Sequence, residues 1–129
     1  MSPRTQAPIA VVHDFIAAWN ARDFGRIAAL LAADVFYHNV PLEPLRGRDA
    51  VDRYLRKMEH CEAIEWRLLN VAADGPIVLT ERVDEFVIRG VRVSLPVMGA
   101  FEIRDGEITA WRDYFDLASY RAQLARVPA

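Results

Sequence analysis

Two charged residues on one predicted strand are spaced so that they could carry out proton chemistry together. Residues 77–88, IVLTERVDEFVI, are rich in β-branched and apolar types, which predicts a strand. Side chains alternate along a strand, so Arg82 and Asp84 share a face. The same face carries Val78, Thr80, Phe86 and Ile88. Burying a lone guanidinium or carboxylate is expensive, so on a buried face these two must pair with each other or with a third group.

Asp113 is a candidate for that third group. In the predicted strand over 107–115, alternation places Thr109, Trp111 and Asp113 on one face, with Asp113 near the end of the strand. If Asp113 reached Arg82, one guanidinium would be shared between two carboxylates. Arginine stays charged and presents a planar set of donors that can bond both acids.

An Asp–Arg–Asp trio has a chemical use. Two neighbouring carboxylates push one pKa up, while an arginine between them keeps the other down. One aspartate can then take a proton from water while the other gives a proton to a leaving oxygen. The alternative is a structural ion-pair network, since most Arg–Asp pairs on strands belong to solvated faces.

Tyr37 and Asn39 are candidates for holding the water. They are two residues apart on an extended segment, so they share a face, and both carry polar groups. Next to two acids and an arginine, this pair could direct a water toward its target. Each also has an ordinary explanation: Tyr37 as a half-buried aromatic residue, and Asn39 as a turn residue before Pro41.

Other reactive groups in the chain lack the partners that chemistry requires. His13, His38 and His60 are isolated, without metal-ligand spacing, and Cys61 has no evident activating base. We therefore expect no metal site. With 16 basic and 18 acidic residues, the net charge is −2, so the chain lacks the excess of positive charge that is typical of nucleic-acid-binding proteins.

Composition also bounds the location and the number of domains. A single cysteine cannot form an internal disulfide, which favours a reducing, cytoplasmic compartment. No apolar run approaches the roughly 18 residues of a membrane span, and MSPRTQAP has no signal-peptide core. A length of 129 residues is typical of one domain, so we expect residues 1–129 to form one.

Hydrophobic periodicity predicts helices first and a sheet afterwards. Helices are expected over 9–20, after an N-cap at Asp23, over 50–59 and over 117–124. Strands are expected over 35–39, 64–71, 77–88, 91–103 and 107–115. Short turn signals join the later strands, so they predict an antiparallel meander in an α+β domain. Helices across one face would leave a cone that encloses a small molecule, and apolar residues on both faces favour a homodimer.

Four sequence blocks resemble the limonene-1,2-epoxide hydrolase family. They are Tyr37-His38-Asn39, Gly47 to Val51, Thr80-Glu81-Arg82-Val83-Asp84 and Gly106 to Leu117. The T-E-R-V-D and W-R-D-Y-F-D blocks are specific to the family, whereas the leading helices and Gly47-Arg48-Asp49 are shared more widely. The likeness runs from the first helix to about Leu117.

The resemblance implies both a fold and an activity. The fold is the nuclear-transport-factor-2-like (SnoaL-like) cone, a curved, mixed but mostly antiparallel sheet with three to four helices over it, in a dimer. The activity is a one-step, cofactor-free opening of a small apolar epoxide, terpene-like or cyclic, by water to give a vicinal diol. By position, Asp113 resembles the base, Asp84 the acid and Arg82 the bridge between them. Tyr37 and Asn39 match the residues that position the water.

The resemblance identifies the residues of the substrate pocket less directly than it identifies the catalytic residues. The candidates are Met58, Phe86, Leu95, Val97 and Phe115.

Two other functions stay open. A ketosteroid-isomerase- or polyketide-cyclase-like enzyme of the same fold would use one aspartate to take a proton from carbon, and would have little use for an arginine between two acids. A non-catalytic module would hold an apolar ligand in the cone without turnover.

Overall fold

The computed structural model describes residues 7–129, and residues 1–6, on which part of the signal-peptide prediction falls, lie outside the described residues. The elements are α1 (Pro8–Asn20), α2 (Phe24–Ala29), β1 (Leu31–Val40), β2 (Leu45–Arg46), α3 (Arg48–Leu55), the 3₁₀ helix η2 (Arg56–His60), β3 (Ala63–Asp74), β4 (Ile77–Ile88), β5 (Val91–Arg104), β6 (Glu107–Tyr114) and α4 (Leu117–Leu124). Between residues 7 and 129, no helix combines the length and the apolar character that crossing a membrane requires.

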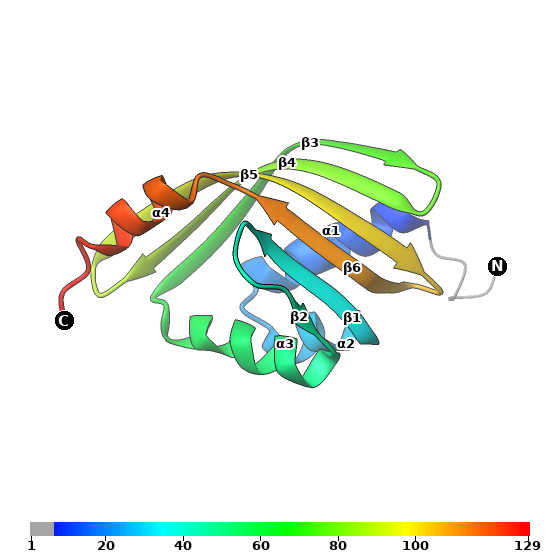
Figure 1. Cartoon of the computed structure of the whole chain (residues 1–129), viewed down its shortest axis with the longest axis horizontal. Coiled ribbons are helices and arrows are strands. Elements are labelled where there is room, and N and C mark those ends of the chain that lie inside the picture. The colour runs from blue at the N-terminus through cyan, green and yellow to red at the C-terminus, as the bar shows by residue number, and fades with distance from the viewer. Residues whose placement is uncertain (1–6) are drawn as a thin grey trace.

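One six-stranded sheet forms the body of the molecule. Its strand order is β2-β1-β6-β5-β4-β3. Strands β3 to β6 form the expected antiparallel meander, and β1 runs parallel to β6. Figure 1 shows the long strands arching over α1, with α3 below them and α4 at one end. The predicted fold class, a curved mixed sheet with helices packed over it, is confirmed.

Helix α1 fills the concave side of the sheet with aromatic side chains. Phe15 makes edge contacts to Trp19, Trp66, Phe101 and Trp111, with ring centroids 5.0–6.4 Å apart. These five side chains are all buried. Such edge-to-face contacts between buried rings add to the stabilisation from burial alone. The aromatic cluster therefore holds α1 at a fixed distance from the strands that carry the predicted site.

The short helices and the first strand depart from the predicted bounds. The sequence predicts a helix over 50–59, whereas α3 begins at Arg48 and gives way to η2 at Arg56. The strand predicted over 35–39 begins earlier, at Leu31, because its first residues pair with β6. The N-cap prediction is confirmed: the Asp23 carboxylate accepts a hydrogen bond from the Arg26 amide at 3.0 Å.

A β-bulge changes which side chains of β6 face the core. Strict alternation predicts Thr109 beside Trp111, but the register shifts next to Glu102 and leaves Thr109 without a partner on β5. The Thr109 hydroxyl instead donates to the Glu102 carbonyl oxygen at 3.1 Å. Because the extra residue inverts the alternation, Ile108 is fully buried and Thr109 is not. The prediction that Thr109 shares the face of Asp113 is therefore wrong.

Candidate active site

Arg82 lies between the two aspartates, and all five of its donors have acceptors. Nε and Nη2 donate to the two carboxylate oxygens of Asp84 at 3.0 and 2.8 Å. Nη1 and Nη2 donate to the two oxygens of Asp113 at 3.2 and 2.9 Å. The remaining Nη1 donor reaches the Thr80 hydroxyl at 3.0 Å. The predicted contact between Arg82 and both acids is thus present in the structure, and the three charged residues are 1–8% exposed.

The register of the sheet brings the acids together. Gly99 on β5 is the Cα partner of both Thr80 on β4 and Asp113 on β6, and Asn39 on β1 is the partner of Asp113. These residues form one row across four strands. The Arg82 side chain begins two residues farther along β4 than Thr80, so it must pass over Gly99 to reach Asp113.

Gly99 leaves room for that path. A Cβ atom at this position would stand under 3.0 Å from Arg82 Nη1, Asp113 Oδ1 and Thr80 Oγ1. Real Cβ atoms essentially never approach so closely, so any side chain here would displace the shared guanidinium. The requirement is one of space, because Gly99 is not among the glycines with positive φ.

The trio also has an aromatic support. The guanidinium carbon of Arg82 lies 4.4 Å from the centroid of the Trp66 ring and 5.8 Å from that of Phe101. Cations bind favourably over aromatic faces, most of all where water is excluded. Trp66, on the neighbouring strand β3, is the Cα partner of Asp84. The two residues are therefore neighbours in the sheet, and both line the cavity.

Burial and neighbouring charges change the pKa values of Asp84 and Arg82. Burial raises the pKa of Asp84 from 3.8 to about 6, with Arg82 opposing this rise and Asp113 adding to it. Burial acts to lower the pKa of Arg82, but the carboxylates of Asp113 and Asp84 together raise it above its ordinary value. The guanidinium therefore stays charged while Asp84 can hold a proton close to neutral pH.

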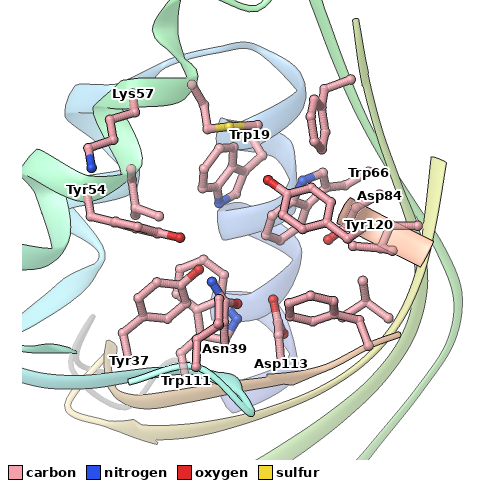
Figure 2. A pocket seen from close by; sticks show the side chains of 17 residues that line it. Trp19, Tyr37, Asn39, Tyr54, Lys57, Trp66, Asp84, Trp111, Asp113 and Tyr120 are labelled. Atoms are coloured by element: carbon pink, nitrogen blue, oxygen red, sulfur yellow. The ribbon is translucent and has the colours of Figure 1, made fainter. Parts of the chain in front are cut away.

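Tyr37 and Asn39 lie beside Asp113, as the sequence predicts. Asn39 pairs with Asp113 and Tyr37 with Trp111, along the parallel pair of strands β1 and β6. Figure 2 shows Tyr37, Asn39 and Asp113 pointing into the same cavity. Burial, and next the charge of Asp113, raise the pKa of the Tyr37 phenol well above 10.0, so it is a neutral donor at pH 7.

The cavity has a volume of about 220 Å³, and its walls are mostly apolar. All five predicted pocket residues line it: Met58, Phe86, Leu95, Val97 and Phe115. Four of the five predicted catalytic residues also line it: Tyr37, Asn39, Asp84 and Asp113. Arg82 is not part of the lining, because it lies buried behind the two acids.

Several site residues escape prediction from the sequence. The additional lining side chains are Trp19, Leu42, Tyr54, Leu55, Lys57, Trp66, Trp111 and Tyr120. Most of them read as ordinary core positions at helical or strand spacing, and only the packing of helices on the sheet shows that they face a cavity. Gly99 carried a usable signal, since a glycine inside a strand often marks the close approach of another group.

Metal ligation receives no support from the described part of the chain. Within residues 7–129, no group of three or more His, Cys, Asp or Glu side chains is placed to hold an ion. The Cys61 thiol is buried, and that burial raises its pKa.

Comparison with known proteins identifies the family. The model of the limonene-1,2-epoxide hydrolase catalytic domain matches residues 6–126. Epoxide hydrolase EphG of Mycobacterium tuberculosis (strain ATCC 25618 / H37Rv) is 41% identical over 106 residues, which are 82% of this chain and 71% of that protein.

Solved structures agree with the sequence comparison. An epoxide hydrolase of M. tuberculosis, described as similar to limonene-1,2-epoxide hydrolase, shares 39% identity with a TM-score of 0.83, over 92% of this chain and 90% of that one. A candidate polyketide cyclase from Xanthomonas campestris pv. campestris shares 27% identity with a TM-score of 0.79, over 95% of this chain and 99% of that one. The chain belongs to the limonene-1,2-epoxide hydrolase family.

Proposed function

We propose that this chain adds water to an epoxide in one step, with Asp113 as base and Asp84 as acid. Arg82 bridges the two acids, and Tyr37 and Asn39 position the water. The observation that carries the proposal is the guanidinium shared between two buried carboxylates that both face the cavity. Family membership supports the same reaction, because both M. tuberculosis relatives are named epoxide hydrolases.

The proposed step balances within the cavity. The oxygen of water forms a bond to one epoxide carbon as its proton passes to Asp113. The bond between that carbon and the ring oxygen breaks, and the ring oxygen takes the proton of Asp84. The product is a vicinal diol, and a proton then returns from Asp113 to Asp84. No oxidant, reductant or cofactor enters this balance, and no ester forms on the protein.

The site can supply the acid that the step needs. A general acid must carry its proton near the working pH, and the raised pKa of Asp84 allows this. The other carboxylate, that of Asp113, accepts two hydrogen bonds from Arg82, which hold it at the wall of the cavity. Proton donation to the departing oxygen avoids a free alkoxide in an apolar cavity.

The lining favours a small, mainly apolar epoxide, terpene-like or cyclic. Phe86, Leu95, Val97 and Phe115 supply apolar surface around the acids. Binding sites of this kind combine apolar walls with a few convergent polar groups. The direct test is diol formation from a panel of terpene, cyclic and aliphatic epoxides. Failure to form a diol from any of them would favour the isomerase or ligand-binding alternatives.

The pH dependence of the reaction follows from the pKa of Asp84. Because Asp84 must be protonated to act as the acid, kcat/KM should fall as the pH rises above about 6. The residual activity of Asp84→Asn should lack this falling limb, since the amide does not titrate. Initial rates between pH 5 and 9, in buffers of constant ionic strength, measure both profiles. An unchanged limb in the variant would assign it to another group.

We also propose that the protein is a homodimer that pairs through the outer face of the sheet. Leu79, Met98 and Tyr114 are 49%, 55% and 47% exposed, and alternation places them on the face opposite the cavity. Met98 and Tyr114 are direct Cα partners, so the apolar surface continues across β5 and β6. Such exposed apolar groups are typical of interfaces.

Charged pairs on the same face favour a second copy as the partner. Glu85 pairs with Arg92 on one side of the apolar centre, and Glu102 with Arg112 on the other. Both signs are present on each side, so a face of this kind can be complementary to itself about a two-fold axis.

Met98→Glu should therefore convert a dimer into a monomer, because it places two charges at the centre of the paired faces. Light scattering coupled to size exclusion measures the mass directly, and Arg53→Glu on the exposed side of α3 is the matched control. A wild-type mass of one chain, or a dimeric Met98→Glu, would contradict this interface.

A further inference from the structure

Trp19 places a buried, unpaired donor at the wall of the cavity. Its side chain is 3% exposed, yet its indole Nε1 has no hydrogen-bond partner among the described residues. Trp19 lines the cavity, and Figure 2 shows its nitrogen on the edge of the ring that faces the open centre. A buried donor without an acceptor costs roughly 1–3 kcal/mol, so such a group calls for a partner.

Packing prevents the indole from turning toward another partner. The ring stacks on Trp66 with centroids 4.8 Å apart and planes 13° apart, and it makes edge contacts to Phe15 and Phe24. The next residue, Asn20, hydrogen-bonds the Trp66 backbone in both directions, at 2.6 and 3.1 Å. The end of α1 is thus tied to β3, and the acceptor for Trp19 must come from the cavity.

Trp111 Nε1 is a second buried donor without a partner in the described residues. It differs from Trp19 in its position. Trp111 is the Cα partner of Tyr37 and is two residues before Asp113, so its indole belongs to the strand wall that carries the proposed reaction. The proposed step uses neither indole N–H. Trp19 belongs to α1, on the helical side of the cavity, so it is the donor that a substrate group away from the epoxide ring can reach.

Two phenols accompany Trp19 on the helical side of the cavity. Tyr54 of α3 and Tyr120 of α4 line the cavity, and Figure 2 shows both hydroxyls directed into it. Burial raises the pKa of Tyr120, and the nearby phenol of Tyr54 raises it further, so Tyr120 is neutral at pH 7. Trp19, Tyr54 and Tyr120 form what we term the helix-side donor cluster.

We propose that the helix-side donor cluster binds a second, uncharged oxygen of the substrate, so that the enzyme is selective for epoxides bearing a carbonyl or hydroxyl group away from the epoxide ring. An indole N–H can only donate, so the ligand atom must be an acceptor. A purely hydrocarbon substrate would cover this donor without pairing it. The unpaired donors are neutral, which matches an uncharged acceptor, and a carboxylate analogue tests whether Lys57, which also lines the cavity, attracts an anionic group instead.

This inference rests on the proposed function, and a matched pair of substrates tests it separately. Limonene-1,2-epoxide and its analogue with an acetyl group in place of the isopropenyl group have the same shape and differ in =CH₂ against =O. We expect wild-type protein to prefer the acetyl epoxide by roughly 3- to 10-fold in kcat/KM, the worth of one neutral hydrogen bond. The preference should appear in KM, since the remote contact is the same in the ground and transition states.

Trp19→Phe is the informative variant, because it keeps an aromatic ring against Trp66 and removes the N–H together with part of the indole. The two substrates have the same shape, so the lost ring volume should affect both alike. The acetyl preference, which is the ratio of the two kcat/KM values, should fall toward unity, whatever change the variant causes in both rates together. Circular dichroism in the near ultraviolet checks that the variant is folded. If it is not, Tyr120→Phe is the second variant and should reduce the same preference.

The outcomes separate the two proposals. Hydrolysis of both epoxides at equal kcat/KM by wild-type protein would overturn the inference and leave the proposed function intact, because a water would then satisfy Trp19. An acetyl preference that persists in Trp19→Phe, or a stronger preference for a carboxylate analogue, would also overturn it. Hydrolysis of neither epoxide would overturn the inference and count against the proposed function.

Discussion

Replacing Asp113 with asparagine should lower kcat/KM for epoxide hydration by about 10²–10⁴, the usual contribution of a general base. The amide has nearly the shape of the carboxylate but cannot accept the proton of water at neutral pH. The loss should appear in kcat, since the proton moves only in the reaction step. Steady-state rates with chromatographic quantification of the diol measure it.

The control for Asp113→Asn is another carboxylate paired with an arginine on the same strands. Glu102 accepts a hydrogen bond from Arg112 at 2.6 Å. The Glu102 side chain is partly exposed and does not line the cavity. Glu102→Gln makes the same chemical change there and should leave the rate unaltered. Full activity in folded Asp113→Asn would sink the assignment of Asp113 as the base.

Gly99→Ala should abolish most activity although it removes no functional group. The added methyl would approach Arg82, Asp113 and Thr80 more closely than packing permits, so the shared guanidinium must move. A displacement of about 1 Å can cost on the order of 10²-fold in rate, and here it would affect the bridge and the base together. Steady-state kinetics on folded protein measures the effect.

Gly25→Ala is the matched control for Gly99→Ala. A Cβ at Gly25 would meet Asp23 Oδ1 at 3.6 Å, an ordinary contact, and the position lies in helix α2, where alanine is favoured over glycine. This variant should keep full activity and be at least as stable as wild type. If Gly99→Ala were as active as Gly25→Ala, the close arrangement around Arg82 would not be needed for the reaction.

The strand side of the site is accessible to sequence reasoning because alternation along a strand is a strong geometric rule. Spacing alone places Arg82 beside Asp84, and Tyr37 beside Asn39. The contact between Arg82 and Asp113 is different. It depends on the register of three strands and on the missing side chain of Gly99, and neither follows from the spacing of the charged residues.

The helical side of the site could not be predicted in the same way. Trp19 fits the apolar stripe of an amphipathic helix, which identifies a buried residue but not the direction of its indole nitrogen. That direction follows from stacking on Trp66, which is 47 residues away along the chain. Thr109 shows where the alternation rule itself fails, since one bulge inverts the order of inward and outward side chains on β6.

The single domain and the cytoplasmic location stay predictions.

The origin of the oxygen that opens the epoxide distinguishes direct attack by water from an ester intermediate on the protein. A single turnover with protein in excess over limonene-1,2-epoxide, in ¹⁸O-labelled water, is followed by mass spectrometry of the diol and of the peptides that contain Asp84 and Asp113. Direct attack by a water that Asp113 deprotonates predicts one ¹⁸O atom in the diol and none in either peptide. An unlabelled diol with ¹⁸O in one of the aspartates would mean an ester intermediate and would contradict the one-step account.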